Sequence, residues 1–209
     1  MNIFIKFVFL FCFMLGCFSC NDVPKKTRES KKETCMYGFN EAETKVSWSA
    51  YKTTDKVKVT GYFKTLSTDR TGILYTSIME FVDGINFSIN SSSSISGDVI
   101  RDASVKDYFF KFFTENFQIN GNLEVVSQKK VIAHLDMFGV DTPIALSFSI
   151  AEDMLNLRGR ISLNEIGAVQ AFNSIHDKCV DLHRGPDGIS KTWDQVDISI
   201  DIPIVKDCR

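Results

Sequence analysis

Apolar and polar residues alternate along most of the chain beyond Lys45, a pattern that is typical of β-strands with one buried face. The first run places Val46, Trp48 and Ala50 on one face. Comparable runs follow at residues 57–64, 74–81, 85–90, 123–127, 131–137, 143–151, 154–162 and 195–205. The breaks between them are short and rich in turn residues, which favours an antiparallel barrel or sandwich over a parallel sheet. A barrel of about eight strands is just wide enough to be filled by side chains or to hold one small ligand.

The stretch from Asn86 to Phe117 interrupts the alternation with a predicted short helix. Four serines and Gly97 end the preceding strand, and Asp102 is the expected N-cap because its carboxylate can accept the free amides of the first turn. Apolar side chains then recur at helical spacing, at Val105, Phe109, Phe112 and Phe113. Such an aromatic helix needs a larger cover. We expect it either to plug one end of the sheet or to enclose an apolar chamber with it.

A second, longer helix is predicted between Glu165 and Leu182, with Asn164 as its cap. Its apolar stripe consists of Ile166, Val169, Phe172, Ile175, Cys179 and Leu182. This helix would lie across the barrel before the chain returns as the last strand. The expected fold is mainly β, a single antiparallel barrel of about eight strands with one short and one longer helix.

Residues 1–19 have the pattern of a secretory signal, because Lys6 precedes an apolar run that is too short to span a bilayer comfortably. The pairs Ser19-Cys20 and Gly16-Cys17 both resemble the cleavage sites of bacterial lipoproteins. We favour acylation at Cys20, where polar sequence begins, over acylation at Cys17. A signal that is cleaved without acylation is the alternative.

The charged and polar stretch 21–34 cannot bury enough apolar surface to fold by itself. Residues 20–44 are therefore predicted to be a flexible tether that begins at the lipid anchor, and residues 45–209 to be the folded domain. Together these features predict an exported, membrane-anchored lipoprotein of the bacterial cell envelope, on its periplasmic side or at the cell surface.

The composition and the motifs that the sequence lacks argue against nucleic-acid binding and against several common classes of enzyme. The chain has 209 residues, enough for one domain with a core or a barrel, and 18 of them are phenylalanine. Its formal net charge of −2 at pH 7 gives no indication of a nucleic-acid partner. The sequence contains no G-x-S-x-G, H-E-x-x-H, phosphate-binding loop or Rossmann glycine run. We therefore expect neither a cofactor nor a catalysed reaction.

Three stretches resemble the YceI-like family of bacterial exported proteins. They are 48–52 (WSAYK) leading to 59–63 (VTGYF), then Ile89 through Arg101-Asp102 to Phe109-Phe110, and the late helix with 191–193 (KTW) leading to 196–198 (VDI). The resemblance covers residues 45–205. It implies a lipocalin-like antiparallel barrel with a helix beside it, which holds an isoprenoid or another long amphiphilic chain. The chain departs from the best-known members in its predicted lipid anchor and in lacking a His-Ser pair at the start of its first strand.

Large apolar side chains on one face of the strands either fill a barrel or line a chamber for an alkyl or prenyl chain. The candidate wall consists of Trp48, Phe63, Phe81, Phe87, Phe109, Phe112 and Phe113. Arg101 either meets the polar head of a ligand or pairs locally with Asp102 or Asp98. Together with the resemblance, these residues predict a protein that binds a hydrophobic or amphiphilic ligand of isoprenoid, quinone or fatty-acyl type and does not act on it chemically.

Three cysteines remain beyond the predicted lipid anchor, at Cys35, Cys179 and Cys208. In an exported protein two of them are expected to be oxidised to a disulfide. Because the first and last strands of a closed antiparallel barrel are neighbours, we favour the pairing Cys35–Cys208 over Cys179–Cys208.

His176, Cys179 and His183 form an H-x2-C-x3-H motif and offer a rival function, an envelope metalloprotein or a cysteine-dependent enzyme. On one helix the three would lie within about 60° of one another, but about 10.5 Å of rise separates the two histidines. That is too far for both to bind one ion without unwinding. A disulfide or a packed thiol is the expected use of Cys179.

Overall fold

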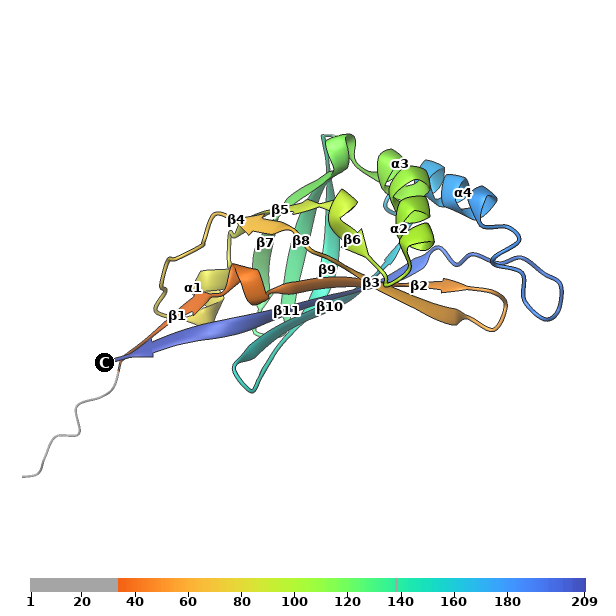
Figure 1. The fold of residues 1–209 in the computed structure, drawn as a ribbon. Helices are drawn as coiled ribbons and strands as arrows, with labels where there is room; N and C mark the ends of the chain where they lie inside the picture. Colours follow the sequence, from red (N-terminus) through yellow and green to blue (C-terminus); the bar gives the residue numbers. More distant parts are fainter. Residues whose placement is uncertain (1–33, 138) are drawn as a thin grey trace, which may run out of the picture. The chain divides into compact units, whose positions relative to one another are not determined.

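Strands dominate the computed structural model, which describes residues 34–137 and 139–209 (Figure 1). The strands are β1 (Cys35–Phe39), β2 (Lys45–Lys52), β3 (Val57–Phe63), β4 (Leu66–Thr68), β5 (Asn86–Asn90), β6 (Ser94–Ile95), β7 (Gln118–Ser127), β8 (Lys130–Met137), β9 (Val140–Ala151), β10 (Met154–Ser162) and β11 (Gln195–Cys208). The helices are α1 (Ile78–Val82), α2 (Val99–Val105), α3 (Lys111–Phe113) and α4 (Val169–Lys178), with a π turn η3 (Lys106–Phe110) between α2 and α3 and 3₁₀ turns η1 (Glu41–Glu43), η2 (Ser91–Ser93) and η4 (Glu115–Phe117). In the described part of the chain, no helix has the length and apolar character needed to cross a membrane.

Neighbouring strands pair antiparallel, and the sheet closes on itself as a barrel. The order β5-β7-β8-β9-β10-β11-β2-β3 is continuous, with β4 beside β5 at one end and β6 beside β3 at the other. β4 continues β3, and β6 continues β5, so the same two segments join both ends of the sheet. At the junction Asn90 N donates to Thr65 O at 3.2 Å, and Lys64 N donates to Ser93 O at 3.3 Å. With β3–β4 and β5–β6 each counted once, the barrel has eight strands, which confirms the predicted fold class.

The folded domain begins earlier than predicted. β1 pairs antiparallel with the C-terminal part of β11, and a disulfide joins Cys35 to the opposite Cys208. Backbone hydrogen bonds of 3.0 Å between Thr34 and Arg209 extend this ladder by one pair. The prediction of a tether over residues 20–44 is therefore wrong for its C-terminal part, because the ladder with β11 holds that part in the sheet. The predicted signal peptide and the acylated cysteine lie outside the described residues.

The segment predicted as a strand at 74–81 contains irregular chain followed by α1. Ser77 caps this helix, and its hydroxyl accepts a first-turn amide at 3.1 Å. Phe81 and Val82 are both buried although they are adjacent, which strand alternation disfavours and a helical turn allows. The Phe81 ring packs against Phe39 of β1, with 5.9 Å between centroids. α1 therefore covers one end of the barrel with an inserted aromatic ring.

The short helix begins before the predicted cap. Asp98 is its N-cap and accepts the amides of Ile100 and Arg101, each at 3.0 Å. Asp102, the predicted cap, lies inside the helix and accepts from Ser96 N at 2.8 Å. Both carboxylates therefore fix the entry of the chain into α2, which continues through η3 into α3.

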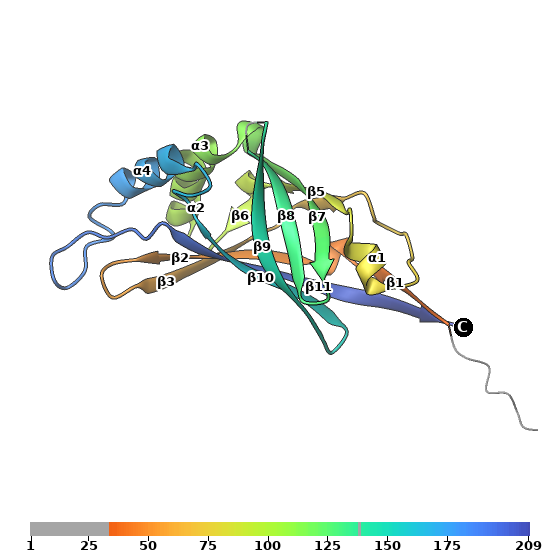
Figure 2. The ribbon, with the colours of Figure 1, turned by 180° about the vertical axis from the view of Figure 1, so that it is seen from behind.

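α4 is shorter than the predicted helix 165–182. It begins soon after Gly167, whose φ of +79° ends the preceding turn, and no side chain caps it. The predicted cap, Asn164, donates from Nδ2 to Asp194 Oδ2 at 3.3 Å. α4 packs against η3 and α3. In both views, α2, α3 and α4 lie at the end of the barrel opposite to α1 (Figure 1, Figure 2).

The interior of the barrel is filled at one end and hollow at the other. We call the part toward α1 the filled end; its fully buried side chains include Phe81, Val82 and Leu155. We call the part toward α2, α3 and α4 the hollow end, where inward side chains border a cavity. Along β11, Ile202 is buried away from the cavity, whereas Val196, Ile198 and Ile200 line it.

Candidate ligand-binding cavity

A cavity of about 450 Å³ occupies the hollow end of the barrel. Its wall is formed by inward-facing positions, which alternate with outward-facing ones along each strand. On the neighbouring strands β2 and β11, Trp48 lies opposite Ile198 and Val46 lies opposite Ile200. Other strands contribute Phe63, Ile119, Leu135, Ile144 and Ile161, among others. The strand wall is therefore a nearly continuous hydrocarbon surface.

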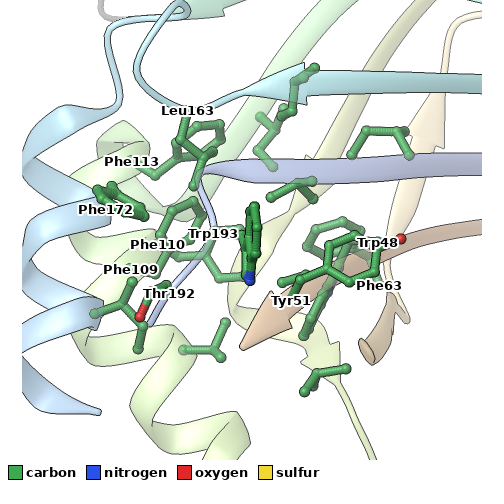
Figure 3. Close-up of a pocket in the computed structure, with 18 of the residues that line it drawn as sticks. Trp48, Tyr51, Phe63, Phe109, Phe110, Phe113, Leu163, Phe172, Thr192 and Trp193 are labelled. Atoms are coloured by element: carbon green, nitrogen blue, oxygen red, sulfur yellow. The ribbon is translucent and has the colours of Figure 1, made fainter. Parts of the chain in front are cut away.

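The helical segments close the cavity with aromatic rings (Figure 3). Phe109, Phe110 and Phe113 reach it from η3 and α3, and Phe172 reaches it from α4. Phe110 meets Phe63 of the strand wall edge to face, with 5.6 Å between ring centroids, and Phe109 stacks on Phe113 at 5.0 Å. Such pairs contribute about 0.5–1.5 kcal/mol each beyond the area that they bury. The Phe110–Phe63 pair joins the helical cover to the strand wall, and the Phe109–Phe113 pair lies within the cover.

The π turn decides which rings of this cover face inward. The sequence stripe assigns Phe109, Phe112 and Phe113 to one face of a regular helix. The wider turn η3 changes the phase of the helix, and the adjacent residues Phe109 and Phe110 both reach the cavity. Phe112 does not line the cavity and packs, partly buried, against the core.

Trp48 is held in the wall by a hydrogen bond and by a glycine. Its Nε1 donates to Ser94 Oγ at 2.9 Å in a buried contact. Gly61 lies opposite on β3, where a Cβ atom would lie 2.3 Å from the indole ring. The glycine inside strand 57–63 therefore marks the close approach of a side chain. Trp193, the second tryptophan of the chain, also lines the cavity, and its Nε1 donates to Thr53 O at 2.9 Å.

The structure brings six of the eight predicted contact residues to the cavity, namely Trp48, Phe63, Phe87, Arg101, Phe109 and Phe113. The prediction is wrong for Phe81, which belongs to α1 and is buried in the filled end. It is also wrong for Phe112, because of the π turn. Arg101 forms an ion pair with Asp98 at 3.5 Å, which is the local pairing considered from the sequence.

Sequence reasoning missed Phe110, Trp193 and Lys52, which also line the cavity. Phe110 depends on the π turn, which no sequence pattern indicates. Trp193 follows α4 in irregular chain, where no periodicity tells the direction of a side chain. Lys52 could have been predicted from the sequence, because it continues the inward-facing row of β2 that contains Trp48 and Ala50.

Polar side chains gather where the cavity meets α4 and the segment after it. Thr192 Oγ1 lies 2.9 Å from His176 Nδ1 and 2.6 Å from His183 Nδ1. A hydroxyl has one proton to donate, so with both rings neutral one imidazole accepts from Thr192 and the other donates to it. Burial above all, and then the positive charge of Lys52, lowers the pKa of His183 from 6.5 to about 4. His183 is therefore neutral at pH 7.

This arrangement does not assemble the metal or catalytic centre considered for His176, Cys179 and His183. The two imidazoles meet at a threonine hydroxyl, and among residues 34–137 and 139–209 no three His, Cys, Asp or Glu side chains are grouped to hold a metal ion. Cys179 is a buried free thiol, since the disulfide joins Cys35 to Cys208. Burial raises the pKa of this thiol, whereas a nucleophilic cysteine needs a lowered pKa.

Comparisons with known proteins identify the fold. No family model and no curated protein sequence matches the chain. Among solved structures, a polyisoprenoid binding domain from Saccharophagus degradans matches with a TM-score of 0.55 and 14% identity, over 80% of this chain and 96% of that chain. BcnA from Burkholderia cenocepacia matches with a TM-score of 0.52 and 16% identity, over 80% of this chain and 99% of that chain. The fold is YceI-like.

The YceI-like fold is the one that the sequence resemblance implied, an antiparallel barrel with helices beside it. The YceI protein of Campylobacter jejuni itself matches with a TM-score of 0.43 and 18% identity, over 72% of this chain and 85% of that chain. The two matches with TM-scores of 0.55 and 0.52 show the fold and not the ligand. The ligand class of this YceI-like barrel has to be inferred from its own cavity.

Proposed function

We propose that this protein is an exported, lipid-anchored binding protein that holds a hydrophobic or amphiphilic small molecule in its barrel and performs no chemistry on it. The observation that carries the proposal is the cavity of about 450 Å³, which is walled by aliphatic side chains from the strands and by aromatic rings from the helices. Ligand sites in proteins have volumes of about 300–1,000 Å³ and mostly apolar linings.

A long tail gains enough free energy in such a cavity to bind without polar contacts. Each buried methylene contributes about 0.8 kcal/mol, so ten contribute about 8 kcal/mol. This corresponds to a dissociation constant of about 1 μM before the cost of immobilising the ligand is subtracted. Isoprenoid, quinone and fatty-acyl compounds all carry tails of this kind. The shared fold with a polyisoprenoid binding domain supports this ligand class.

The sequence and the disulfide support export and anchoring. Residues 1–19 have the pattern of a signal peptide, and Ser19-Cys20 resembles a lipoprotein cleavage site. The Cys35–Cys208 disulfide fits an oxidising compartment. A tether over residues 21–33, fully extended, would reach at most about 45 Å. That length would keep the barrel close to the membrane, where hydrophobic molecules are concentrated.

A bulky side chain in the cavity tests the binding proposal. Ala133 lines the cavity from β8, whereas Ala145 on the neighbouring β9 is exposed. A phenyl ring at position 133 occupies space that the tail needs, while the same ring at position 145 projects into solvent. We expect Ala133→Phe to weaken the binding of dodecanol at least tenfold, and Ala145→Phe to leave it unchanged, in isothermal titration calorimetry. Unchanged affinity in folded Ala133→Phe protein would contradict binding in the cavity.

Metabolic labelling with an alkyne-bearing palmitate tests the anchor. We expect the label on the wild-type protein and on Cys17→Ala, and no label on Cys20→Ala. Labelled Cys20→Ala protein together with unlabelled Cys17→Ala protein would move the acylated residue to Cys17. An unlabelled wild-type protein would contradict the anchor itself.

A further inference from the structure

One lysine stands in the row of β2 side chains that faces the cavity. Val46, Trp48, Ala50 and Lys52 follow one another at a two-residue period, and all four line the cavity, as does the adjacent Tyr51 near the end of the strand. The first three are apolar, as inward positions usually are, and Lys52 is half-buried. From Val46 to Lys52 the strand rises by about 20 Å. The row therefore begins with apolar side chains and ends with the positive charge of Lys52, close to the helices of the hollow end.

The charge of Lys52 is not matched by a carboxylate in the described part of the chain. Its Nζ lies 3.5 Å from Leu182 O, which is a weak contact. By contrast, Arg101, Arg158 and Arg160 each form an ion pair with an aspartate. An unpaired ammonium in a mostly apolar wall can attract an anion that enters the cavity. Lys52 shares its unpaired charge with the other described lysines, and it differs from them in lining the cavity.

The groups around Lys52 leave the cavity wall positive. The backbone of Lys52 pairs with that of Thr192, whose side chain lies between two imidazoles. His183 is neutral at pH 7 because of its low pKa. Among the described residues that line the cavity, the one carboxylate is Asp98, and Arg101 neutralises it. An anion would therefore meet attraction from Lys52 without a competing repulsion from the wall.

We propose that the ligand carries an anionic headgroup, a carboxylate or a phosphate, that binds the Lys52 ammonium while its tail extends along β2 toward Val46. This inference rests on the proposed function and adds the headgroup to it. A lysine ammonium acts as a compact point charge and does not require the planar geometry that a guanidinium selects. Neutral alcohols and quinones would fill the same hydrocarbon space and leave the lysine unpaired.

Two matched pairs of amphiphiles test the headgroup on the intact mature protein. Dodecanoate is compared with dodecanol, and farnesyl phosphate with farnesol, by calorimetry at pH 7.5 below the micellar concentration. We expect the wild-type protein to bind the anion of at least one pair at least tenfold more tightly than its alcohol. The pair that shows the preference distinguishes a fatty acid from a prenyl phosphate as the source of the anion.

Three variants assign the preference to Lys52. Lys52→Met removes the charge at similar length, so it should weaken anion binding about tenfold and leave alcohol binding unchanged, whereas Lys52→Arg should keep the preference. Lys58→Met is the matched control, because Lys58 is exposed on the adjacent strand β3. Equal affinity for anions and alcohols, or a preference that survives Lys52→Met, would overturn the headgroup and leave the proposed function intact. Absence of binding by all four compounds would overturn both.

Discussion

The two ends of the barrel share their strands and differ in their contents. At the filled end, Phe81 and Leu155 have 0% exposed surface. At the hollow end, Ile198 and Ile200 of the same sheet face a cavity of about 450 Å³. Apolar and polar positions alternate along the strands in the same way at both ends. This alternation determines which side chains point into the barrel, but it does not determine whether those side chains contact one another across the interior. The covering segment makes the difference.

The two covers attach to the barrel in different ways. α1 places Phe81 against Phe39 and the adjacent core, so its ring completes the packing. The helices at the hollow end pack against one another, through α4 with η3 and α3, and touch the wall mainly through ring edges such as Phe110 on Phe63. A helix pair that supports itself can stand over a barrel without entering it. The hollow end therefore keeps its space.

Removing the disulfide at the filled end should have a large effect on stability. Cys35 and Cys208 are 173 residues apart, and closing such a loop stabilises the folded state by about 5 kcal/mol in the chain-entropy model. The double variant Cys35→Ser/Cys208→Ser should lose about 2–5 kcal/mol in urea unfolding. Its dodecanol affinity should remain unchanged, because the cavity lies at the other end. A double variant that keeps its stability but loses its dodecanol affinity would contradict a structural role for the disulfide at the end away from the cavity.

Truncating one aromatic ring at each end compares the two packings directly. Phe81→Ala should cost about 3–5 kcal/mol, because it opens a void in a filled region. Phe110 is 4% exposed and already borders the cavity, so Phe110→Ala should cost about 2 kcal/mol or less. Urea unfolding of both variants measures the difference. Equal losses would mean that the hollow end is as tightly packed as the filled end.

The smallest expected effect is a pH dependence at the hollow end. The pKa of His183 is about 4 in the folded protein, below its usual value of 6.5, so between these values the unfolded chain binds the proton first. The stability that neutral His183 contributes is complete above pH 6.5 and is lost as the pH falls through 4. Because the ring is half-buried, we expect a loss of no more than about 2 kcal/mol.

Urea unfolding at pH 7 and pH 5 measures this dependence, and His183→Gln should reduce it. His134 titrates with the opposite sign, because hydrogen bonds to Glu124 and Asp141 raise its pKa. Its contribution is complete below pH 6.5 and is lost as the pH rises through its raised pKa, so between pH 7 and pH 5 it acts against the loss caused by His183. A His183→Gln protein with the full wild-type dependence would assign the acid sensitivity to another group.

The barrel could be predicted from the sequence because its signals are local. The two-residue period of β2 and β3, with short turns between strands, fixes the antiparallel class, and the glycine at 61 marks where the Trp48 indole passes. β1 was missed because Cys35–Phe39 is too short to show a period, and its partner β11 lies at the other end of the chain. Pairing over that separation is a property of the closed fold.

The division of the interior could not be predicted, for a different reason. Phe81 and Phe63 are both large aromatic residues in runs that look like strands, yet one fills the barrel and the other lines the cavity. The outcome depends on whether the helical cover enters the barrel. Likewise, the π turn that brings Phe110 inward depends on packing against α4. By contrast, the alternation of β2 already indicated Lys52, which continues the row of Val46, Trp48 and Ala50.

A brominated alkyl chain tests most directly whether the hollow end holds a hydrocarbon tail. Trp48 and Trp193, the two tryptophans of the chain, both line the cavity, and bromine quenches indole fluorescence on close contact. We predict that saturating brominated dodecanoate quenches most of the tryptophan emission, while potassium bromide at the same bromine concentration does not. Emission that is unchanged at saturating brominated chain would contradict the presence of the tail between these rings.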